Sequence, residues 1–204
     1  PPDPNIVGDK WKDMWLERLE KSGLWLKNWL EHQRHDEFWE HGSVGFSYEA
    51  IKCPVYAVSG WADGYTNTVF RLMKNLDVPR KGLVGPWGHK YPHEGIPGMG
   101  IGFLGDCLRW WDQWLKGVDR GVKEDPRLQV WMQDSYSPRS LRRPGKWVAV
   151  DWPSSTVDST NYYLDHEGHL VTTPSKESKA MSIQSPLSVG LFGGKWCSYH
   201  ADTD

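Results

Sequence analysis

The sequence predicts a mixed α/β fold, in which strands alternate with helices between a helical N-terminal segment and a C-terminal run of short strands. Residues 54–89 read as an apolar strand, a helical segment and a second apolar strand. Residues 9–40 carry tryptophan and leucine at helical spacing, and periodicity changes to short β-like runs after Arg127. Strands that alternate with helices form right-handed crossovers, so we expect a parallel sheet.

Composition excludes several classes of function. The chain has 204 residues, enough for one or two domains with a sizeable core, and a formal charge of −2. That balance gives no electrostatic case for a nucleic-acid partner or an anionic membrane. No run of about 18 apolar residues and no signal peptide is present, which favours the cytoplasm over secretion. Because the sequence opens at Pro1 without a methionine, we interpret it as an internal piece of a longer protein.

The first part of the chain predicts a helical pair. Trp11, Trp15 and Leu19 recur every fourth residue, and the pattern resumes at Trp25 after an interruption at 21–23. Each helix should therefore carry one apolar face. We assign residues 1–45 to a helical segment that resembles a cap inserted into a larger sheet domain.

The second part, residues 46–120, predicts two strand–helix units. The strands are expected at 54–58 and 81–84, and the helices at 67–76 and 103–115. Pro79 should prevent continuation of the first helix, and Gly117 should end the second. The second helix has apolar residues at helical spacing, which we expect to be its buried face: Leu104, Cys107, Leu108, Trp111, Trp114 and Leu115.

The third part, residues 121–204, predicts the start of an antiparallel β-sandwich. Short β-like runs at 128–133, 147–150, 162–164 and 170–172 are separated by proline, glycine, serine and aspartate. The chain holds 14 tryptophans, and several lie in this part. They suit either a core and interdomain seam or a sugar-stacking surface. Three scattered cysteines predict no disulfide framework, and we expect Cys53 and Cys107 to be buried thiols.

The candidate chemistry follows the two strands of the second part. Asp63 comes just after the first strand and His89 just after the second. A nucleophilic serine needs a base whose imidazole is held in one tautomer by a carboxylate, and α/β-hydrolases deliver acid and base in this chain order. Alternatively, Asp63 only caps a turn and His89 is an ordinary loop residue. No G-x-S-x-G nucleophile turn occurs in the chain, and neither Ser43 nor Ser59 fits that role.

Two motifs carry a family resemblance. Gly60-Trp61-Ala62-Asp63 and Gly85-Pro86-Trp87-Gly88-His89 resemble the acid and base motifs of the cocaine esterase and X-Pro dipeptidyl-peptidase superfamily, called CocE/NonD or peptidase S15. The resemblance implies the last strand–helix units of an α/β-hydrolase, part of its helical cap and the opening of its C-terminal jelly-roll. It also implies that Asp63 and His89 are catalytic and that the serine lies upstream of this chain.

The resemblance implies a small ester or peptide substrate, acyl transfer and no cofactor. Trp61 and Trp87 either wall an acyl pocket or pack beneath the loops. An alternative function is a carbohydrate-binding or structural β-sandwich module on an inactive paralogue. We expect no metal, because Pro92 prevents a helix from aligning His89 with His93, and a pair formed by Cys197 and His200 would be incomplete. A homo-oligomer remains open.

Overall fold

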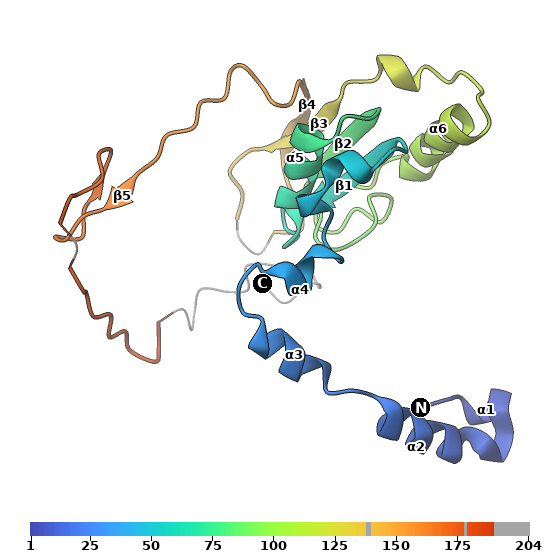
Figure 1. Cartoon of the computed structure of the whole chain (residues 1–204). Helices are drawn as coiled ribbons and strands as arrows, with labels where there is room; N and C mark the ends of the chain where they lie inside the picture. Colours follow the sequence, from blue (N-terminus) through green and yellow to red (C-terminus); the bar gives the residue numbers. More distant parts are fainter. Residues whose placement is uncertain (138–139, 178, 190–204) are drawn as a thin grey trace. The chain divides into compact units, whose positions relative to one another are not determined.

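The computed structural model describes residues 1–137, 140–177 and 179–189 (Figure 1). The chain forms two compact units, one over residues 1–47 and the other from residue 48 onward. The limits of the three expected domains stay a prediction. Among the described residues, no helix combines the length and apolar character that crossing a bilayer requires. Cys197 and His200, the pair set aside as an incomplete metal site, and Trp196, one of the tryptophans of the third part, lie outside the described residues.

The first unit is helical, as the spacing predicts. It contains α1 (Pro4–Val7), α2 (Trp11–Lys21), α3 (Trp25–Glu31) and α4 (Glu37–Glu40), with 3-10 turns at Gly8–Lys10 and Val44–Phe46. The carboxylates of Asp3 and Asp36 cap α1 and α4 by accepting backbone N–H groups of the first turn. The apolar faces are not covered within the unit: Trp25 is 65% and Trp29 54% exposed.

The second unit is built on a four-stranded sheet of order β1-β2-β3-β4. After a 3-10 turn at Tyr48–Ala50, the elements are β1 (Val55–Gly60), α5 (Thr66–Asn75), β2 (Arg80–Gly85), α6 (Phe103–Leu115), a 3-10 turn η4 (Val122–Glu124), β3 (Leu128–Gln133) and β4 (Gly145–Val150). β1, β2 and β3 are parallel, and β4 is antiparallel to β3. The two predicted strand–helix units are therefore confirmed, within a mixed α/β sheet.

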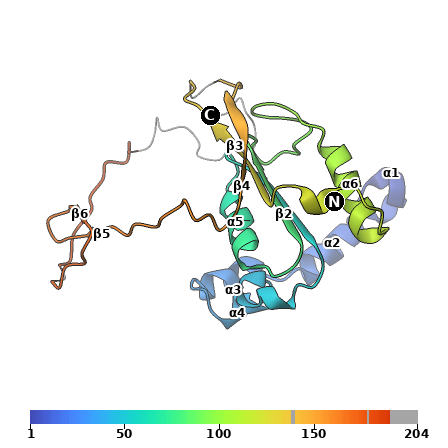
Figure 2. The same cartoon turned by 90° about the horizontal axis from the view of Figure 1, so that it is seen from above.

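Helices cover both faces of this sheet (Figure 2). Successive strand residues point to opposite faces, so adjacent positions of β1 contact different helices. Ala57 belongs to the main core with Val69 and Met73 of α5. Tyr56, on the other face, contacts the ring of Trp110 in α6.

The strands expected to open the sandwich differ from prediction. Residues 128–133 form β3, which pairs in parallel with β2, and residues 147–150 lie in β4 of the same sheet. Leu128 and Val130 are buried in the core beneath α5, so burial favours their addition to the existing sheet. The segment containing α6 and η4 is the crossover that a parallel return requires. Within the described part of the chain, β5 (Tyr163–Leu164) and β6 (Leu170–Val171) are the one antiparallel pair separate from this sheet.

The predicted buried face of α6 is also wrong in large part. Leu104, Leu108, Trp111 and Leu115 are between 51% and 75% exposed, whereas Trp110, Asp112 and Gln113 are buried. On the sheet side of α6, Asp106 pairs with Lys81 of β2 and Trp110 packs against Tyr56 of β1, so polar and aromatic residues share that side. The prediction for the cysteines fails as well, since Cys53 is exposed and Cys107 only half-buried.

Candidate active site

The acid and base candidates lie together at the carboxyl end of the parallel sheet. Gly60 and Gly85, the last residues of β1 and β2, are paired in register, so the loops that follow leave the sheet side by side. His89 Nδ1 lies 3.1 Å from Asp63 Oδ2. Two residues 26 positions apart in sequence thus form the contact that the motif spacing predicts.

Backbone hydrogen bonds fix the two loops to each other. The N–H of Trp61 donates to the carbonyl of Gly85 at 2.9 Å, and the N–H of Ala62 donates to that of Trp87 at 3.1 Å. Gly60 permits this approach, because a Cβ at that position would lie 1.9 Å from the Trp87 carbonyl oxygen. The strand end therefore requires glycine for steric reasons.

Asp63 is oriented by its own turn. Its Oδ1 accepts the backbone N–H of Tyr65 at 3.0 Å, which leaves Oδ2 directed at the histidine. The Thr66 hydroxyl donates to the carbonyl groups of Gly60 and Asp63 and closes the turn at the start of α5. The carboxylate is 11% exposed and the imidazole 50%, so the acid is sheltered while the base reaches solvent.

A cavity of about 440 Å³ opens beside the pair and is lined by both side chains. Trp87 contributes to its wall; the indole is 1% exposed and donates its N–H to the Met99 carbonyl at 2.7 Å. Trp61 is not among the lining residues. Its indole stacks on Phe70 and donates to the Trp131 carbonyl at 2.6 Å, while 38% of the residue stays exposed, so it packs on α5 and β3 and does not wall the cavity.

Two further residues at this site were not identified from sequence. Ser59, which we considered only as a nucleophile, lines the cavity, and its hydroxyl is buried without a hydrogen-bond partner among the described residues. Tyr65 presents its ring edge-on to His89 at a centroid distance of 6.1 Å. Both flank the motif residues in sequence, but nothing in their spacing indicates contact with an imidazole. Ser43 lies in the first unit, where its hydroxyl caps a 3-10 turn.

A possible metal-ligand cluster lies elsewhere, on the β5–β6 turn. Ligand atoms of Asp165, Glu167 and His169 lie within 4.8 Å of one another. Asp165 Oδ1 already accepts the backbone N–H groups of the other two residues. These hydrogen bonds lower the pKa of Asp165. They also account for the cluster as an ordinary aspartate-stabilised turn.

Comparison with known proteins points to a family of hydrolases. The family model for X-Pro dipeptidyl-peptidase (S15 family) matches residues 4–91, which include both motifs. A crystal structure of a CocE/NonD family hydrolase from Staphylococcus aureus superposes with a TM-score of 0.54 at 19% identity, covering 80% of this chain and 29% of that one. Over residues 4–91 the chain is similar to the peptidase S15 family, and its fold is similar to that of a CocE/NonD hydrolase.

Curated relatives of this chain include two mycobacterial proteins. "Putative serine esterase Mb1866c" of Mycobacterium bovis and "Putative serine esterase MT1883" of Mycobacterium tuberculosis are each 25% identical over 130 residues. The alignment covers 60% of this chain and 19% of each relative. The chain thus spans about a fifth of the length of these relatives.

The tryptophans of the third part bear on the alternative of a sugar-binding module. Trp147 contacts the rings of Trp87 and Trp131. Trp152 packs against Phe70 of α5 and donates its indole N–H to the carbonyl of that residue. These three indoles therefore engage the α/β sheet unit, which favours packing over a sugar-stacking surface.

Proposed function

We propose that this chain supplies the acid and the base of a Ser-His-Asp triad in a hydrolase that cleaves small esters or peptides by acyl transfer. The observation that carries the proposal is the 3.1 Å contact between His89 Nδ1 and Asp63 Oδ2 beside an open cavity. The nucleophilic serine belongs to a part of the protein outside these 204 residues.

In this proposal the two side chains have separate roles. Asp63 accepts the Nδ1 proton and holds the imidazole in the tautomer whose Nε2 acts as a base. Nε2 then takes the proton of the serine hydroxyl as its oxygen attacks the substrate carbonyl, and passes it to the leaving alcohol or amine. Water repeats the sequence on the acyl-enzyme. The sheltered position of Asp63 limits the contact of its carboxylate with water, while the imidazole stays open to solvent.

The family connection supports both substrate classes. The S15 model is named for peptides with proline in the second position, whereas the curated mycobacterial relatives are named as esterases. Either substrate presents a planar carbonyl group, and the apolar wall at Trp87 suits an acyl group. We therefore propose a small ester or peptide and assign no preference between them.

The proposal is tested first in the protein that joins this chain to its nucleophile-bearing part. We expect His89→Ala to lower kcat/KM for an activated ester by on the order of a thousandfold or more. His169→Ala is the matched control, because this histidine lies on the exposed β5–β6 turn. Near-normal hydrolysis by the His89→Ala protein would show that the base lies elsewhere.

A second test needs only this chain. In the native chain, ¹⁵N spectroscopy of the imidazole above its titration range should show the proton on Nδ1 of His89. Asp63→Asn replaces the acceptor by an amide that can donate, so the neutral ring should change to the Nε2–H tautomer. An identical tautomer in both proteins would mean that Asp63 does not orient His89.

A further inference from the structure

A second cavity lies at the opposite end of the sheet from the candidate active site. It has a volume of about 410 Å³ and shares no lining residue with the cavity beside His89. Its walls come from the start of β2, the second half of α6 and the turn η4. A cavity of this size suits a small organic ligand.

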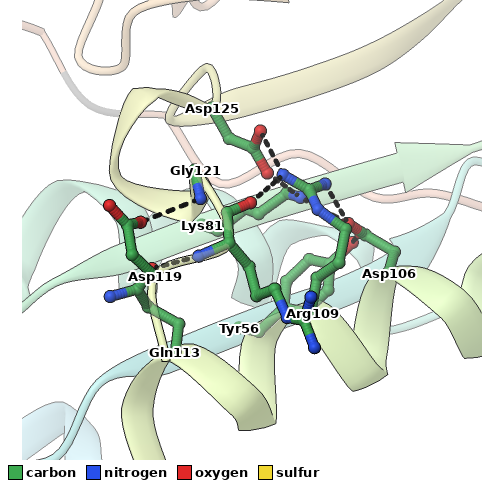
Figure 3. Close-up of polar contacts among 9 residues, drawn as sticks. Tyr56, Lys81, Asp106, Arg109, Gln113, Asp119, Gly121 and Asp125 are labelled. Carbon is green, nitrogen blue, oxygen red and sulfur yellow. Dashed lines mark hydrogen bonds and ion pairs between the residues drawn. The ribbon is translucent and has the colours of Figure 1, made fainter. Parts of the chain in front are cut away.

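One wall is held by a charge-balanced cluster (Figure 3). Lys81 Nζ lies 2.9 Å from Asp106 Oδ1 and 2.7 Å from Asp125 Oδ2, and Arg109 contacts the same two carboxylates. The Tyr56 hydroxyl also donates to Asp106. The charges of the two cations and the two carboxylates cancel. The charge of Asp125, which is the acidic residue that lines the cavity, is therefore already balanced within the cluster.

Three other cations line the same cavity without a carboxylate partner among the described residues: Arg80, Lys123 and Arg127. Arg80 is oriented by the backbone, because its guanidinium donates to the carbonyl groups of Met73 and Val78. The Lys123 ammonium lies 5.9 Å from the ring centroid of Trp114. The cavity therefore carries uncompensated positive charge, which an anionic group would balance.

Two indoles supply an apolar wall. Trp110 is 4% exposed and Trp114 is half-buried, and both line the cavity. Trp114 Nε1 is buried and has no hydrogen-bond acceptor among the described residues. A buried donor without an acceptor is unfavourable, and such groups are rare in folded proteins.

We propose that this cavity binds an aromatic carboxylate. The ring of the ligand packs against the indoles, and its carboxylate is held by the cations at Arg80, Lys123 and Arg127. Arginine is suited to this role because its planar guanidinium matches a carboxylate in two parallel hydrogen bonds. This binding site is independent of the proposed triad, since the two cavities occupy opposite ends of the strands.

The proposal is tested by titrating the ¹⁵N-tryptophan-labelled chain with naphthalene-2-carboxylate. The indole N–H resonance of Trp114, assigned by its loss in a Trp114→Phe chain, should shift saturably. Naphthalene-2-methanol, the neutral analogue, and inorganic phosphate, the anion without a ring, should each bind about tenfold more weakly or not at all. An equal response to either probe would overturn the proposed ligand class.

A charge-matched pair of variants locates the site. Lys123→Gln/Arg127→Gln removes two cavity cations and should weaken naphthalene-2-carboxylate binding by about tenfold or more. Lys52→Gln/Lys74→Gln removes the same charge from exposed positions outside the cavity and should leave the affinity unchanged. All four changed side chains are exposed, so both variants should keep the native spectrum elsewhere. Equal weakening in the two variants, or none in the first, would refute the site.

Discussion

The ion pairs of Lys81 offer a sharp test of how α6 is held on the sheet. The Lys81 side chain is 6% exposed, and its ammonium contacts two carboxylates that are 22% and 20% exposed. Lys81→Met keeps the aliphatic stem but leaves one uncompensated negative charge beside Arg109. Removing one partner of a buried ion pair costs about 3–5 kcal/mol. Because the carboxylates retain some contact with water, we expect the lower end, about 3 kcal/mol.

A compensating variant separates charge imbalance from lost packing. In Lys81→Met/Asp125→Asn, one cation and one anion are removed together, and the contact between Arg109 and Asp106 at 3.2 Å remains. If the uncompensated charge causes the loss of stability, the free energy of unfolding of the double variant should exceed that of Lys81→Met by about 1–2 kcal/mol.

The assay is urea unfolding followed by tryptophan fluorescence, which reports the free energy of unfolding of each protein. Asp125→Asn alone completes the cycle and gives the coupling energy between the two positions. A free energy of unfolding of the Lys81→Met protein within about 0.5 kcal/mol of the native value would refute the reasoning. Strictly additive losses in the double variant would refute it equally.

Three further predictions follow from other contacts. Gly60→Ala should lower the free energy of unfolding by more than about 2 kcal/mol, because the added Cβ meets the Trp87 carbonyl. Gly105→Ala, in open space within α6, should instead raise it by about 0.5–1 kcal/mol. Thermal melts of the two proteins measure the difference. Burial raises the pKa of Asp125, but hydrogen bonds from its cationic partners outweigh it and lower the pKa below its usual range. Its stabilising contribution is therefore present above about pH 4 and is lost as pH falls through the folded-state pKa, and urea midpoints measured from pH 6 to pH 3 should decline less in Asp125→Asn. Burial, and then the hydrogen bond to Asp106, raise the pKa of Tyr56. The folded chain should thus lose stability above about pH 10, where tyrosines of the unfolded chain ionise, and Tyr56→Phe should reduce that loss in urea titrations at alkaline pH.

The sequence pattern was sufficient to predict an element where the residues of that element alone determine its structure. Short motifs and periodicity predict five features that the structure contains: the strands β1 and β2, the helices α5 and α6, and the Asp63–His89 contact. Parallel neighbours end at the same edge of a sheet, so residues just beyond each strand meet whatever the intervening sequence contains. The placement of an acid and a base there could therefore be predicted.

The pattern failed where partners decide the outcome. Trp111 and Leu115 have the spacing of a buried face, yet they are exposed, whereas Trp110 is buried against Tyr56 and Asp106 pairs with Lys81 of the sheet. Leu128 and Val130 have the alternation of a sandwich strand, yet they complete the core beneath α5. Periodicity predicts that one face of an element can be buried, but it does not predict which other element will cover that face.

Sequence by itself predicted an α/β chain with two motifs that resemble the acid and base motifs of S15 and CocE/NonD hydrolases, and a helical first part. Only the tertiary structure decided that β3 and β4 extend the sheet and that Trp87, but not Trp61, lines the cavity. It alone also brought together, at the other end of the strands, three cations that have no carboxylate partner among the described residues. The physical reason is the sequence distance over which each kind of interaction acts. Motifs and periodicity are set by neighbours within a few residues, whereas burial and charge balance depend on side chains brought together from distant positions.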